Sequence, residues 1–402
     1  MMSKEKRRVP KLRFPGFTED WEQRKLGSIG STYTGLSGKT KEDFGHGEAQ
    51  YITYLNVFQN TVSDITMTDK VEIDTTQNEV KYGDVLFTTS SETPEEVGMS
   101  SVWLGHMPNI YLNSFCFGFR PNQKIDPYFL GYSLRAPYMR DKIKILAQGI
   151  SRYNISKNKV MELEISLPNN EEQRLLGNFL RNIDLSITLH QRKLDNLKLK
   201  KKALLQKLFP KNGERYPELR FPGFTDAWEQ RKLSDITEIV MGQSPSSKNY
   251  TDNPNDNILV QGNADLKDGK VVPRLWTKEI TKTIDKDGII LTVRAPVGDV
   301  ARTDYKVVLG RGVAGIKGND YIFQFLQKLQ NNRYWVSLSS GSTFESINSN
   351  DIKDLFIDIP SIEEQTKISM LLNNINSIIT LHQRKLDHLK LQKKALLQQM
   401  FV

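Results

Sequence analysis

Two stretches of the chain carry apolar side chains at alternating spacings of four and three residues, which is the heptad pattern of coiled-coil helices. Polar residues interrupt each seam at two positions, His190 and Lys201 in the first stretch and His382 and Lys393 in the second. The apolar members, called seam residues below, are Leu176, Leu180, Ile183, Ile187, Leu194, Leu197, Leu204, Leu208, Ile368, Leu372, Ile375, Ile379, Leu386, Leu389, Leu396 and Met400. The pattern predicts two helices of roughly 33 residues, each about 50 Å long at the usual rise per residue.

The two predicted helices need a partner for their apolar seams. No glycine or proline interrupts the first seam after Gly177, and Pro210 is expected to end that helix. Two such helices in one chain most simply pack on each other, so we expect an antiparallel coiled coil. The alternative is that each helix lies on its own domain.

Between these stretches the chain has short runs rich in β-branched and aromatic residues, separated by Gly, Asn, Asp and Pro, which predict strands. Such runs occur at residues 51–55, 84–88, 258–260 and 289–293. A helical pattern follows the strands at residues 127–145 and again at residues 321–338. The expected fold class is therefore α+β, with two globular heads of mixed α/β structure that are each followed by one long helix.

The sequence contains two long internal repeats. Residues 12–26 return at residues 219–233 with thirteen of fifteen positions identical. The octapeptide Thr-Leu-His-Gln-Arg-Lys-Leu-Asp of residues 188–195 recurs unchanged at residues 380–387. Repeats at this spacing indicate duplicated domains rather than a stack of short repeats. They predict a pseudo-two-fold arrangement in which one common frame carries two different heads.

The displacement between the repeats shows where the two halves of the chain differ in length. It is 207 residues at the opening (12 to 219) and 192 at the closing segment (188 to 380), so the first half has 15 extra residues in its divergent middle. We expect a first head at residues 1–168 with its helix at 169–210, and a second head at 211–360 with its helix at 361–402. Residues 210–217, with two prolines and an Asn-Gly pair, predict a turn-rich linker.

Composition favours two folded domains in a reducing compartment. The 402 residues are 38% hydrophobic, and no run of eighteen apolar residues predicts a membrane span. The basic start of the chain is not followed by an apolar stretch, so it does not predict a secretory signal. A lone cysteine, Cys116, excludes an internal disulfide and a thiolate metal cluster and favours the cytoplasm. The net charge of +9 favours a polyanionic partner such as nucleic acid.

One motif suggests a nucleotide site. Gly-Leu-Ser-Gly-Lys-Thr at residues 35–40 resembles the end of a phosphate-binding P-loop, but Tyr33 replaces the earlier glycine that such a loop needs. At the opening displacement this segment aligns with residues 242–247, where Ser246 stands in place of Lys39. A nucleotide cradle would not tolerate that replacement, whereas a surface turn that begins with glycine would. We therefore expect a turn.

No other motif predicts catalysis or a bound cofactor. Glu-Val-Lys at residues 79–81 has the loose spacing of a nuclease site, but the second half does not reproduce it. The sequence shows no methyl-transfer motif, no glycine-rich cofactor loop after a strand, and no distinctive Ser/His/Asp set. No cluster has metal-ligand spacing, and a lone seam histidine such as His190 or His382 more often sets helix register than binds metal. The chain is expected to be non-catalytic, without a cofactor or metal.

Several polar loops carry the residue types that contact nucleic acid. Arginine and asparagine read the edges of guanine and adenine, while Ser, Thr and Lys commonly hold phosphates. In the first head, residues 149–154 form such a loop, whose counterpart in the second half is residues 341–346. The candidate DNA-binding residues are Lys39, Arg152, Tyr153 and Asn154 in the first head and Lys248, Arg294, Arg302 and Arg311 in the second. The alternative for each is an ordinary surface or ion-pair role.

These features together resemble the specificity subunit of type I restriction-modification enzymes. The resemblance covers essentially the whole chain and rests on the two repeated openings, the two seam helices and the segments that lead into them. The lead-in residues are Gly149, Ile155, Pro168, Glu172 and Gln173 in the first half and Gly341, Ile347, Pro360, Glu364 and Gln365 in the second.

The resemblance implies a division of labour. In that family, two target recognition domains each read one half of a split double-stranded DNA sequence. The seam helices act as a spacer and as the docking surface for methyltransferase subunits, of which two are expected. Cleavage, ATP hydrolysis and methyl transfer belong to partner chains, which include restriction and translocase subunits. The variable heads show no fixed set of base-reading residues, so none is carried over.

Two other function classes stay open at the level of sequence. A DNA-modifying enzyme would need a catalytic constellation in at least one head, and it would act on DNA without partners. A scaffold or partner-binding protein would keep the helices without reading DNA, and it would show no sequence preference in a binding assay.

Overall fold

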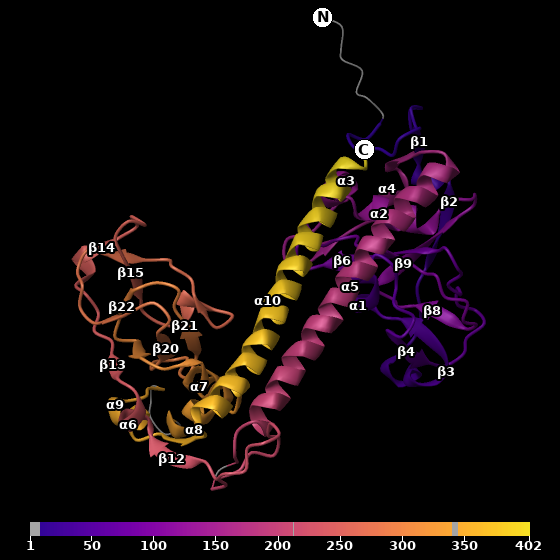
Figure 1. Cartoon of the computed structure of the whole chain (residues 1–402). Helices are drawn as coiled ribbons and strands as arrows, with labels where there is room; N and C mark the ends of the chain where they lie inside the picture. Colours follow the sequence, from indigo (N-terminus) through magenta and orange to yellow (C-terminus); the bar gives the residue numbers. More distant parts are fainter. Residues whose placement is uncertain (1–8, 212, 340–344) are drawn as a thin grey trace, which may run out of the picture. The chain divides into compact units, whose positions relative to one another are not determined.

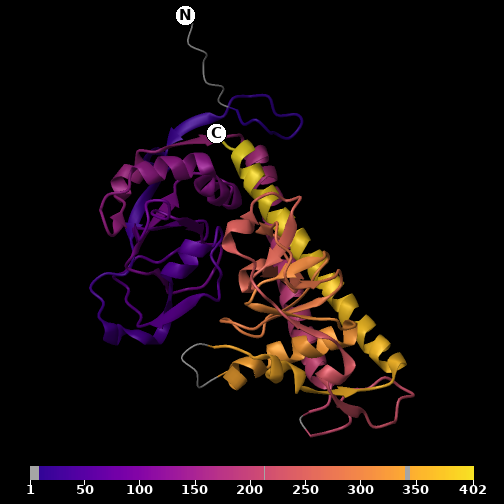
Figure 2. The same cartoon turned by 90° about the vertical axis from the view of Figure 1, so that its left-hand side faces the viewer.

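The computed structural model describes residues 9–211, 213–339 and 345–402 (Figures 1 and 2). The chain divides into two compact units, of which unit 1 comprises Met1–His190 and Arg384–Val402 and unit 2 comprises Gln191–Gln383. Two long helices, α5 (Asn170–Lys207) and α10 (Ile362–Gln399), are each shared between the units. Each unit therefore contains one head, the first half of the long helix that follows this head, and the second half of the other long helix.

The first head, in unit 1, is built from short strands and short helices. Its strands are β1 (Glu22–Lys25), β2 (Gly30–Thr34), β3 (Phe44–Ile52), β4 (Thr68–Val71), β5 (Val85–Thr88), β6 (Ser90–Ser91), β7 (Ser100–Val102), β8 (Ile110–Leu112), β9 (Cys116–Pro121), β10 (Tyr153–Asn154) and β11 (Glu164–Leu167). Its helices are α1 (Tyr54–Gln59), α2 (Pro127–Arg135), α3 (Pro137–Ile145) and α4 (Lys157–Met161).

Strand β5 lies between the two main cores of the first head. It belongs to an antiparallel sheet of order β2-β9-β5-β7, beside a smaller sheet of order β4-β3-β8. Successive side chains of a strand point to opposite faces. Val85 and Phe87 therefore join the core that includes α2, whereas Leu86 joins a second core with Ile52 and Leu112 of the smaller sheet.

The second head, in unit 2, follows the same plan with additional strands. Its strands are β12 (Glu229–Lys232), β13 (Ile239–Met241), β14 (Tyr250–Thr251), β15 (Asn257–Val260), β16 (Leu266–Lys267), β17 (Lys270–Val271), β18 (Trp276–Thr277), β19 (Thr283–Ile284), β20 (Ile289–Thr292), β21 (Val300–Arg302), β22 (Val307–Leu309), β23 (Val313–Ile316) and β24 (Phe356–Ile359). Its helices are α6 (Leu233–Ile236), α7 (Asp320–Asn331), α8 (Tyr334–Ser339) and α9 (Ser349–Lys353).

The sheets of the second head correspond to those of the first. The order β13-β23-β20-β21 matches β2-β9-β5-β7 and is extended by β17 and β16, while β18-β15-β22 matches β4-β3-β8. Strand β20 divides its side chains as β5 does: Ile289 and Leu291 face the core with α7, and Ile290 faces the other core. The expected mixed α/β class with long helices is confirmed.

The repeated openings form equivalent joints in the two units. Strand β1 pairs antiparallel with β11, and β12 pairs in the same way with β24. Arg13 donates from Nε and Nη2 to the two carboxylate oxygens of Glu172 at 2.6 and 2.8 Å, and Arg220 donates likewise to Glu364 at 2.8 Å for both bonds. A guanidinium fork on a buried carboxylate fixes both distance and orientation. The motif thus ties each opening to the first turn of a long helix.

The seam residues are all buried or half-buried. In unit 1, Leu176 and Leu180 of α5 share one core with Met400, which directly follows α10, and Leu396 of α10 packs against that core. In unit 2, Leu205 of α5 and Leu208, which directly follows α5, share a core with Ile368 of α10. Each unit therefore uses segments of both long helices to complete its own core.

The structure corrects several expected elements. Residues 127–145 form α2 and α3 rather than one helix, because Pro137 begins a new helix after Ala136 in extended conformation. Residues 321–338 also form two helices, since Arg333 takes a positive φ of 53° between α7 and α8. The strand expected at residues 51–55 ends at Ile52, because the Thr53 side chain accepts from Asn56 N and caps α1.

The long helices are also longer than expected, with 38 residues each, because they begin before the seam. The first ends at Lys207, shortly before Pro210. Gly177 lies inside α5, where a Cβ would meet Asp126 Oδ1 at 2.5 Å. The glycine therefore lets the N-terminal cap of α2 approach the helix backbone.

Candidate nucleic-acid interface

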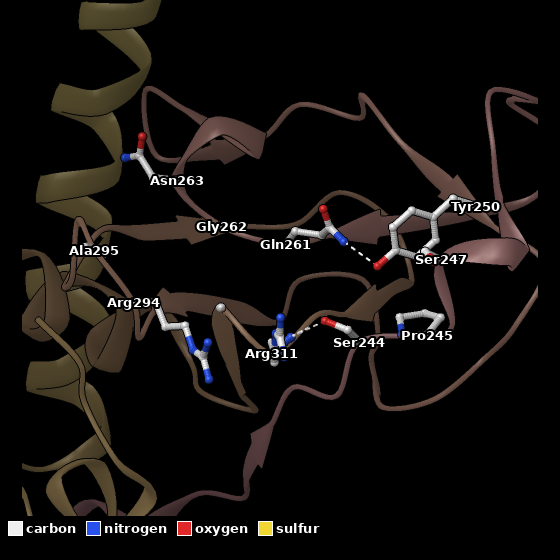
Figure 3. A pocket seen from close by; sticks show the side chains of 11 residues that line it. Ser244, Pro245, Ser247, Tyr250, Gln261, Gly262, Asn263, Arg294, Ala295 and Arg311 are labelled. Atoms are coloured by element: carbon white, nitrogen blue, oxygen red, sulfur yellow. Dashed lines mark hydrogen bonds between the residues drawn. The ribbon is translucent and has the colours of Figure 1, made fainter. Parts of the chain in front are cut away.

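A polar pocket of about 560 Å³ opens at one edge of the second head (Figure 3). Its lining residues are Ser244, Pro245, Ser247, Tyr250, Gln261, Gly262, Asn263, Arg294, Ala295, Arg311 and Gly312. They belong to the segment from β13 to β14, the segments after β15 and β20, and the turn between β22 and β23. The fold thus gathers two arginines and two amide side chains from separate parts of the sequence.

Sheet topology explains why these segments meet. Strand β15 pairs parallel with β22, with Val260 opposite Leu309, so the residues after both strands emerge at the same edge. Strand β20 pairs antiparallel with β23, and Val293 N donates to Gly312 O at 2.9 Å. This bond places the segment that begins at Arg294 beside the turn that carries Arg311.

The amide side of the pocket is held by internal hydrogen bonds. Buried Asp265 accepts from Gln261 N at 2.7 Å and from Gly262 N at 3.2 Å through Oδ2. Gln261 Nε2 in turn donates to the Tyr250 hydroxyl at 2.7 Å (Figure 3). Asn263 Nδ2 donates to Asp299 Oδ2. These contacts hold the backbone of Gln261 and Gly262 and the side chains of Gln261 and Asn263 in place.

Arg294 and Arg311 are exposed, and in the described ranges no acceptor pairs with either guanidinium group. Their backbones, by contrast, are held: Arg311 N donates to Ser244 Oγ at 3.1 Å, and Arg294 bridges Ser346 in antiparallel fashion. Each guanidinium has five N–H donors and no acceptor. In each of these two arginines the backbone is therefore held in place, while the N–H groups of the guanidinium are available to an acceptor.

The other candidates of the second head lie elsewhere. Lys248 is exposed in the short turn next to the pocket-lining Ser247. Arg302 is largely buried, with Nη2 at 2.9 Å from Asp320 Oδ1 and its guanidinium carbon 5.3 Å from the centre of the Phe323 ring. These contacts favour a structural role for Arg302, whereas Lys248 is exposed at the rim of the pocket.

The Arg152 loop of the first head lies at the corresponding edge. Tyr153 and Asn154 form β10, which pairs with β6 so that Asn154 lies opposite Ser90. Arg152 is exposed, and the adjacent Ile150 is 95% exposed. The counterpart loop at residues 341–346 has residues 341–344 outside the described residues, but its Ser346 bridges Arg294 as Asn154 bridges Ser90.

The same register identifies how the two heads differ. Thr88 lies opposite Cys116 in the first head, and Thr292 lies opposite Val313 in the second, so Cys116 and Val313 are equivalent. Counting back from these two residues, Phe115 is equivalent to Gly312 and Ser114 is equivalent to Arg311. Phe115 is 57% exposed at this edge. An aromatic side chain thus stands in the first head where the second has a glycine that leaves its pocket open.

Lys39 has an intramolecular partner. Its Nζ lies 2.8 Å from Asp74 Oδ2, and that contact holds the pKa of the Asp74 carboxyl well below its usual range. The turn begins with glycine in both heads because a larger residue would clash with the backbone. A Cβ on Gly35 would lie 2.1 Å from Asn113 O, and a Cβ on Gly242 would lie 2.1 Å from Gly310 O. The geometry supports a tight turn rather than a phosphate cradle.

The long helices expose apolar residues outside the seam. In unit 1, Leu189 of α5 is 68% exposed and Leu391 of α10 is 67% exposed. In unit 2, Leu381 and Leu199 are each 65% exposed. Leu189 and Leu381 are equivalent in the repeat, and so are Leu199 and Leu391. Each unit therefore displays the same exposed pair, one leucine from each helix.

Sequence patterns missed Tyr250, Gln261 and Asn263 of the pocket. The available signal was Gln-Gly-Asn directly after the predicted strand at residues 258–260, since polar residues that follow a strand end emerge at a sheet edge. The parallel pairing that makes this edge coincide with Arg294 and Arg311 could not be inferred from the sequence.

Within residues 9–211, 213–339 and 345–402, no group of His, Cys, Asp and Glu side chains is arranged to hold a metal ion. Over the same ranges, the helices are too short or too polar to cross a membrane. The sole cysteine, Cys116, is buried, and burial raises the pKa of its thiol to about 12.

Known proteins share both the sequence pattern and the fold. The chain is 29% identical over 398 residues to a protein of Methanocaldococcus jannaschii assigned as the specificity subunit of the type I restriction enzyme MjaX, which covers 94% of this chain and 92% of that protein. The StySPI specificity subunit of Salmonella potsdam is 21% identical and covers 87% of this chain and 81% of its own.

A solved type I restriction-modification S subunit from M. genitalium is similar over 98% of this chain and 99% of its own, with a TM-score of 0.64 and 16% identity. At that identity the likeness concerns the fold. The family model for the type I restriction modification DNA specificity domain matches residues 18–199 and again residues 225–391. Because these two matches span most of the sequence, the chain belongs to the type I restriction modification DNA specificity family.

Proposed function

We propose that this chain recognises a bipartite, asymmetric double-stranded DNA target and brings partner methyltransferase and restriction subunits to it. It is itself a non-catalytic DNA-recognition subunit. The observation that carries the proposal is the contrast between frame and heads. The joints Arg13–Glu172 and Arg220–Glu364 are equivalent, whereas the head edges differ at Ser114 and Arg311. Two different reading surfaces on one repeated frame suit a target with two different halves.

The seam helices are the proposed spacer. An antiparallel coiled coil of α5 and α10 would set the distance between the half-sites, because its length is fixed by the number of heptads. The antiparallel sense is supported within unit 1, where Asp184 of α5 pairs with Lys393 of α10 while Leu176 and Met400 share a core. The proposed domains are a head at residues 1–168 with its helix at 169–210, and a head at 211–360 with its helix at 361–402.

Two methyltransferase subunits are the proposed partners of the exposed leucines. Leu189 with Leu391 in unit 1, and Leu381 with Leu199 in unit 2, present the same exposed apolar residues once in each unit. Single exposed apolar residues are common on protein surfaces, so the support for a docking role comes from their recurrence at equivalent helix positions in the two units. Two equal surfaces accommodate two copies of one partner. The single buried cysteine agrees with a reducing cytoplasm.

A map of methylated motifs in cells with and without this chain tests the DNA-recognition proposal. The expected result is a split motif, two short specific segments separated by unspecified bases, that disappears when the chain is deleted. Methylation that persists unchanged after deletion, or a single uninterrupted motif, contradicts the proposal. Binding by the purified complex is expected to weaken steeply with salt, since phosphate contacts release counterions.

The docking surfaces are tested by stoichiometry. Leu189→Asp with Leu391→Asp, or Leu199→Asp with Leu381→Asp, is expected to leave one methyltransferase per chain in native mass spectrometry, and all four changes none. Ile145→Asp is the matched control, because Ile145 is 81% exposed in the first head and outside both long helices. Unchanged stoichiometry in the fourfold variant contradicts the docking role.

A further inference from the structure

The pocket of the second head contains two arginines whose guanidinium groups can bind hydrogen-bond acceptors. Arg294 and Arg311 extend from the ends of β20 and β22, and Figure 3 shows both side chains among the pocket residues, with Gln261 hydrogen-bonded to Tyr250 nearby. In the described ranges neither guanidinium has an acceptor of its own. A guanidinium fork matches two acceptors that lie side by side in one plane.

The charges around the pocket argue against a phosphate as that ligand. Asp265 holds the backbone of Gln261 and is itself paired with Arg274, whose Nε lies 3.1 Å from its Oδ1. Among the described residues, the Asp299 carboxylate accepts only from amide groups, from Asn263 and, at 2.7 Å, from Gln330, so its negative charge stands beside the lining residue Asn263. A phosphate would be repelled by that carboxylate, whereas a neutral group with paired acceptors would not.

Among DNA bases, guanine presents that pair of acceptors, O6 and N7, in the major groove. We infer that Arg294 and Arg311 read guanines, so that the half-site of the second head contains G·C base pairs at the positions these two side chains reach. This inference rests on the proposed function, and it assigns the base chemistry that the proposed function leaves open. Gln261 and Asn263 add amide groups suited to a neighbouring base edge.

The first head offers a built-in comparison. The strand register places Ser90 where the second head has Arg294, and Ser114 where it has Arg311. A serine hydroxyl contacts either acceptors or donors, so it does not select guanine as a guanidinium fork does. This pair of guanine-reading positions is therefore present in the second head and absent from the first.

The test uses the complete complex of this chain with its methyltransferase subunits. DNA substrates in which each position of the target is varied in turn are methylated and sequenced. The half-site of the second head is identified as the half that stays unchanged when residues 27–160 of the first head are replaced. Arg294→Ala and Arg311→Ala are each expected to relax discrimination about 10- to 100-fold at one formerly G·C position and to leave the other positions intact.

Two further sets of variants separate base reading from other roles. Arg231→Ala removes the same charge from an exposed position of β12 outside the pocket, and it is expected to leave the motif unchanged. Arg294→Lys and Arg311→Lys keep the charge but lose the fork, so discrimination is expected to fall at the same positions as in the alanine variants.

The outcomes distinguish the inference from the proposed function. A split motif whose second half-site has no G·C pair overturns the guanine assignment while the proposed function stands. Alanine variants that lose methylation equally on all sequences, with lysine variants that restore it, also overturn the assignment, because that is the behaviour of a phosphate contact. A wild-type complex with no sequence preference would instead refute the proposed function.

Discussion

Lys393 Nζ lies 2.6 Å from Asp184 Oδ1, and this ion pair joins α10 to α5 within unit 1. The Tyr132 hydroxyl donates to the same carboxylate at 2.7 Å. At the equivalent position in unit 2, Asn376 stands in place of Asp184, and Lys201 Nζ donates to Gln327 Oε1 at 2.8 Å. Burial lowers the pKa of Lys201 to about 8. One repeated lysine therefore has an ionic partner in unit 1 and a neutral one in unit 2.

This difference predicts unequal effects of the same substitution. Lys393→Met leaves a half-buried carboxylate without its cation and is expected to destabilise unit 1 by about 1–3 kcal/mol. Lys201→Met removes a charge that burial disfavours but also removes the donor to Gln327 Oε1, so the stability of unit 2 is expected to change by less than about 1 kcal/mol at neutral pH. Urea titration followed by hydrogen exchange in each unit measures both effects. Equal destabilisation by the two substitutions would refute the assignment of different environments.

Lys201 also predicts a pH dependence. Its pKa is about 8 in the folded chain against an ordinary lysine pKa of 10.5, so the unfolded chain binds more protons between these values. The free energy of unfolding of unit 2 is therefore expected to increase as pH rises from about 8 to about 10. Lys201→Met should remove this increase, and Lys393→Met should retain it. A wild-type slope that survives in Lys201→Met would show that other groups cause it.

The equivalent tryptophans Trp21 and Trp228 allow the hydrogen bonding of the two repeated openings to be compared. Trp228 and Trp21 are each 1% exposed, but Trp228 Nε1 donates to Glu364 Oε2 at 3.2 Å while Trp21 Nε1 has no partner in the described residues. Trp228→Phe is expected to be more destabilising than Trp21→Phe by about 1 kcal/mol, because it also removes a hydrogen bond to a buried carboxylate. Thermal unfolding of the two variants compares them directly, and an equal loss would contradict this role for the indole N–H.

Gly242 supports the wall of the pocket by close backbone packing. A Cβ there would lie 2.1 Å from Gly310 O, so Gly242→Ala must shift the turn that carries Arg311. We expect a loss of at least about 2 kcal/mol in unfolding free energy and weaker discrimination confined to one half-site. Gly262→Ala is the stability control, because nothing lies within 4 Å of a Cβ at that position. Similar stability losses in both variants would rule out this packing argument.

The repeated parts of the chain, which are residues 12–26 with 219–233 and the two long helices, could be predicted from the sequence because their signals are local or occur twice. The heptad spacing predicted the long helices. In the second half, Ser246 stands at the position of Lys39, and this replacement correctly argued against a nucleotide site in the turn after Gly35. The breaks at Pro137 and Arg333 were missed because one helical periodicity runs through both.

The pocket could be predicted only in part. Arg294 and Arg311 were recognised by residue type, but their meeting with Gln261 depends on the parallel pairing of β15 with β22, which is a non-local property. Lys39 and Arg302 matched the same residue types, yet their ion pairs with Asp74 and Asp320 become visible only in three dimensions.

The most direct test of the central claim is a methylation map after exchange of one head. Residues 27–160 lie between the β1 and β11 strands that close the first head, so another head can be inserted there without changing the frame. One half of the split motif is expected to change, while the other half and the gap between them stay the same. A change in both halves, or in neither, would contradict the claim that each head reads its own half of the DNA target.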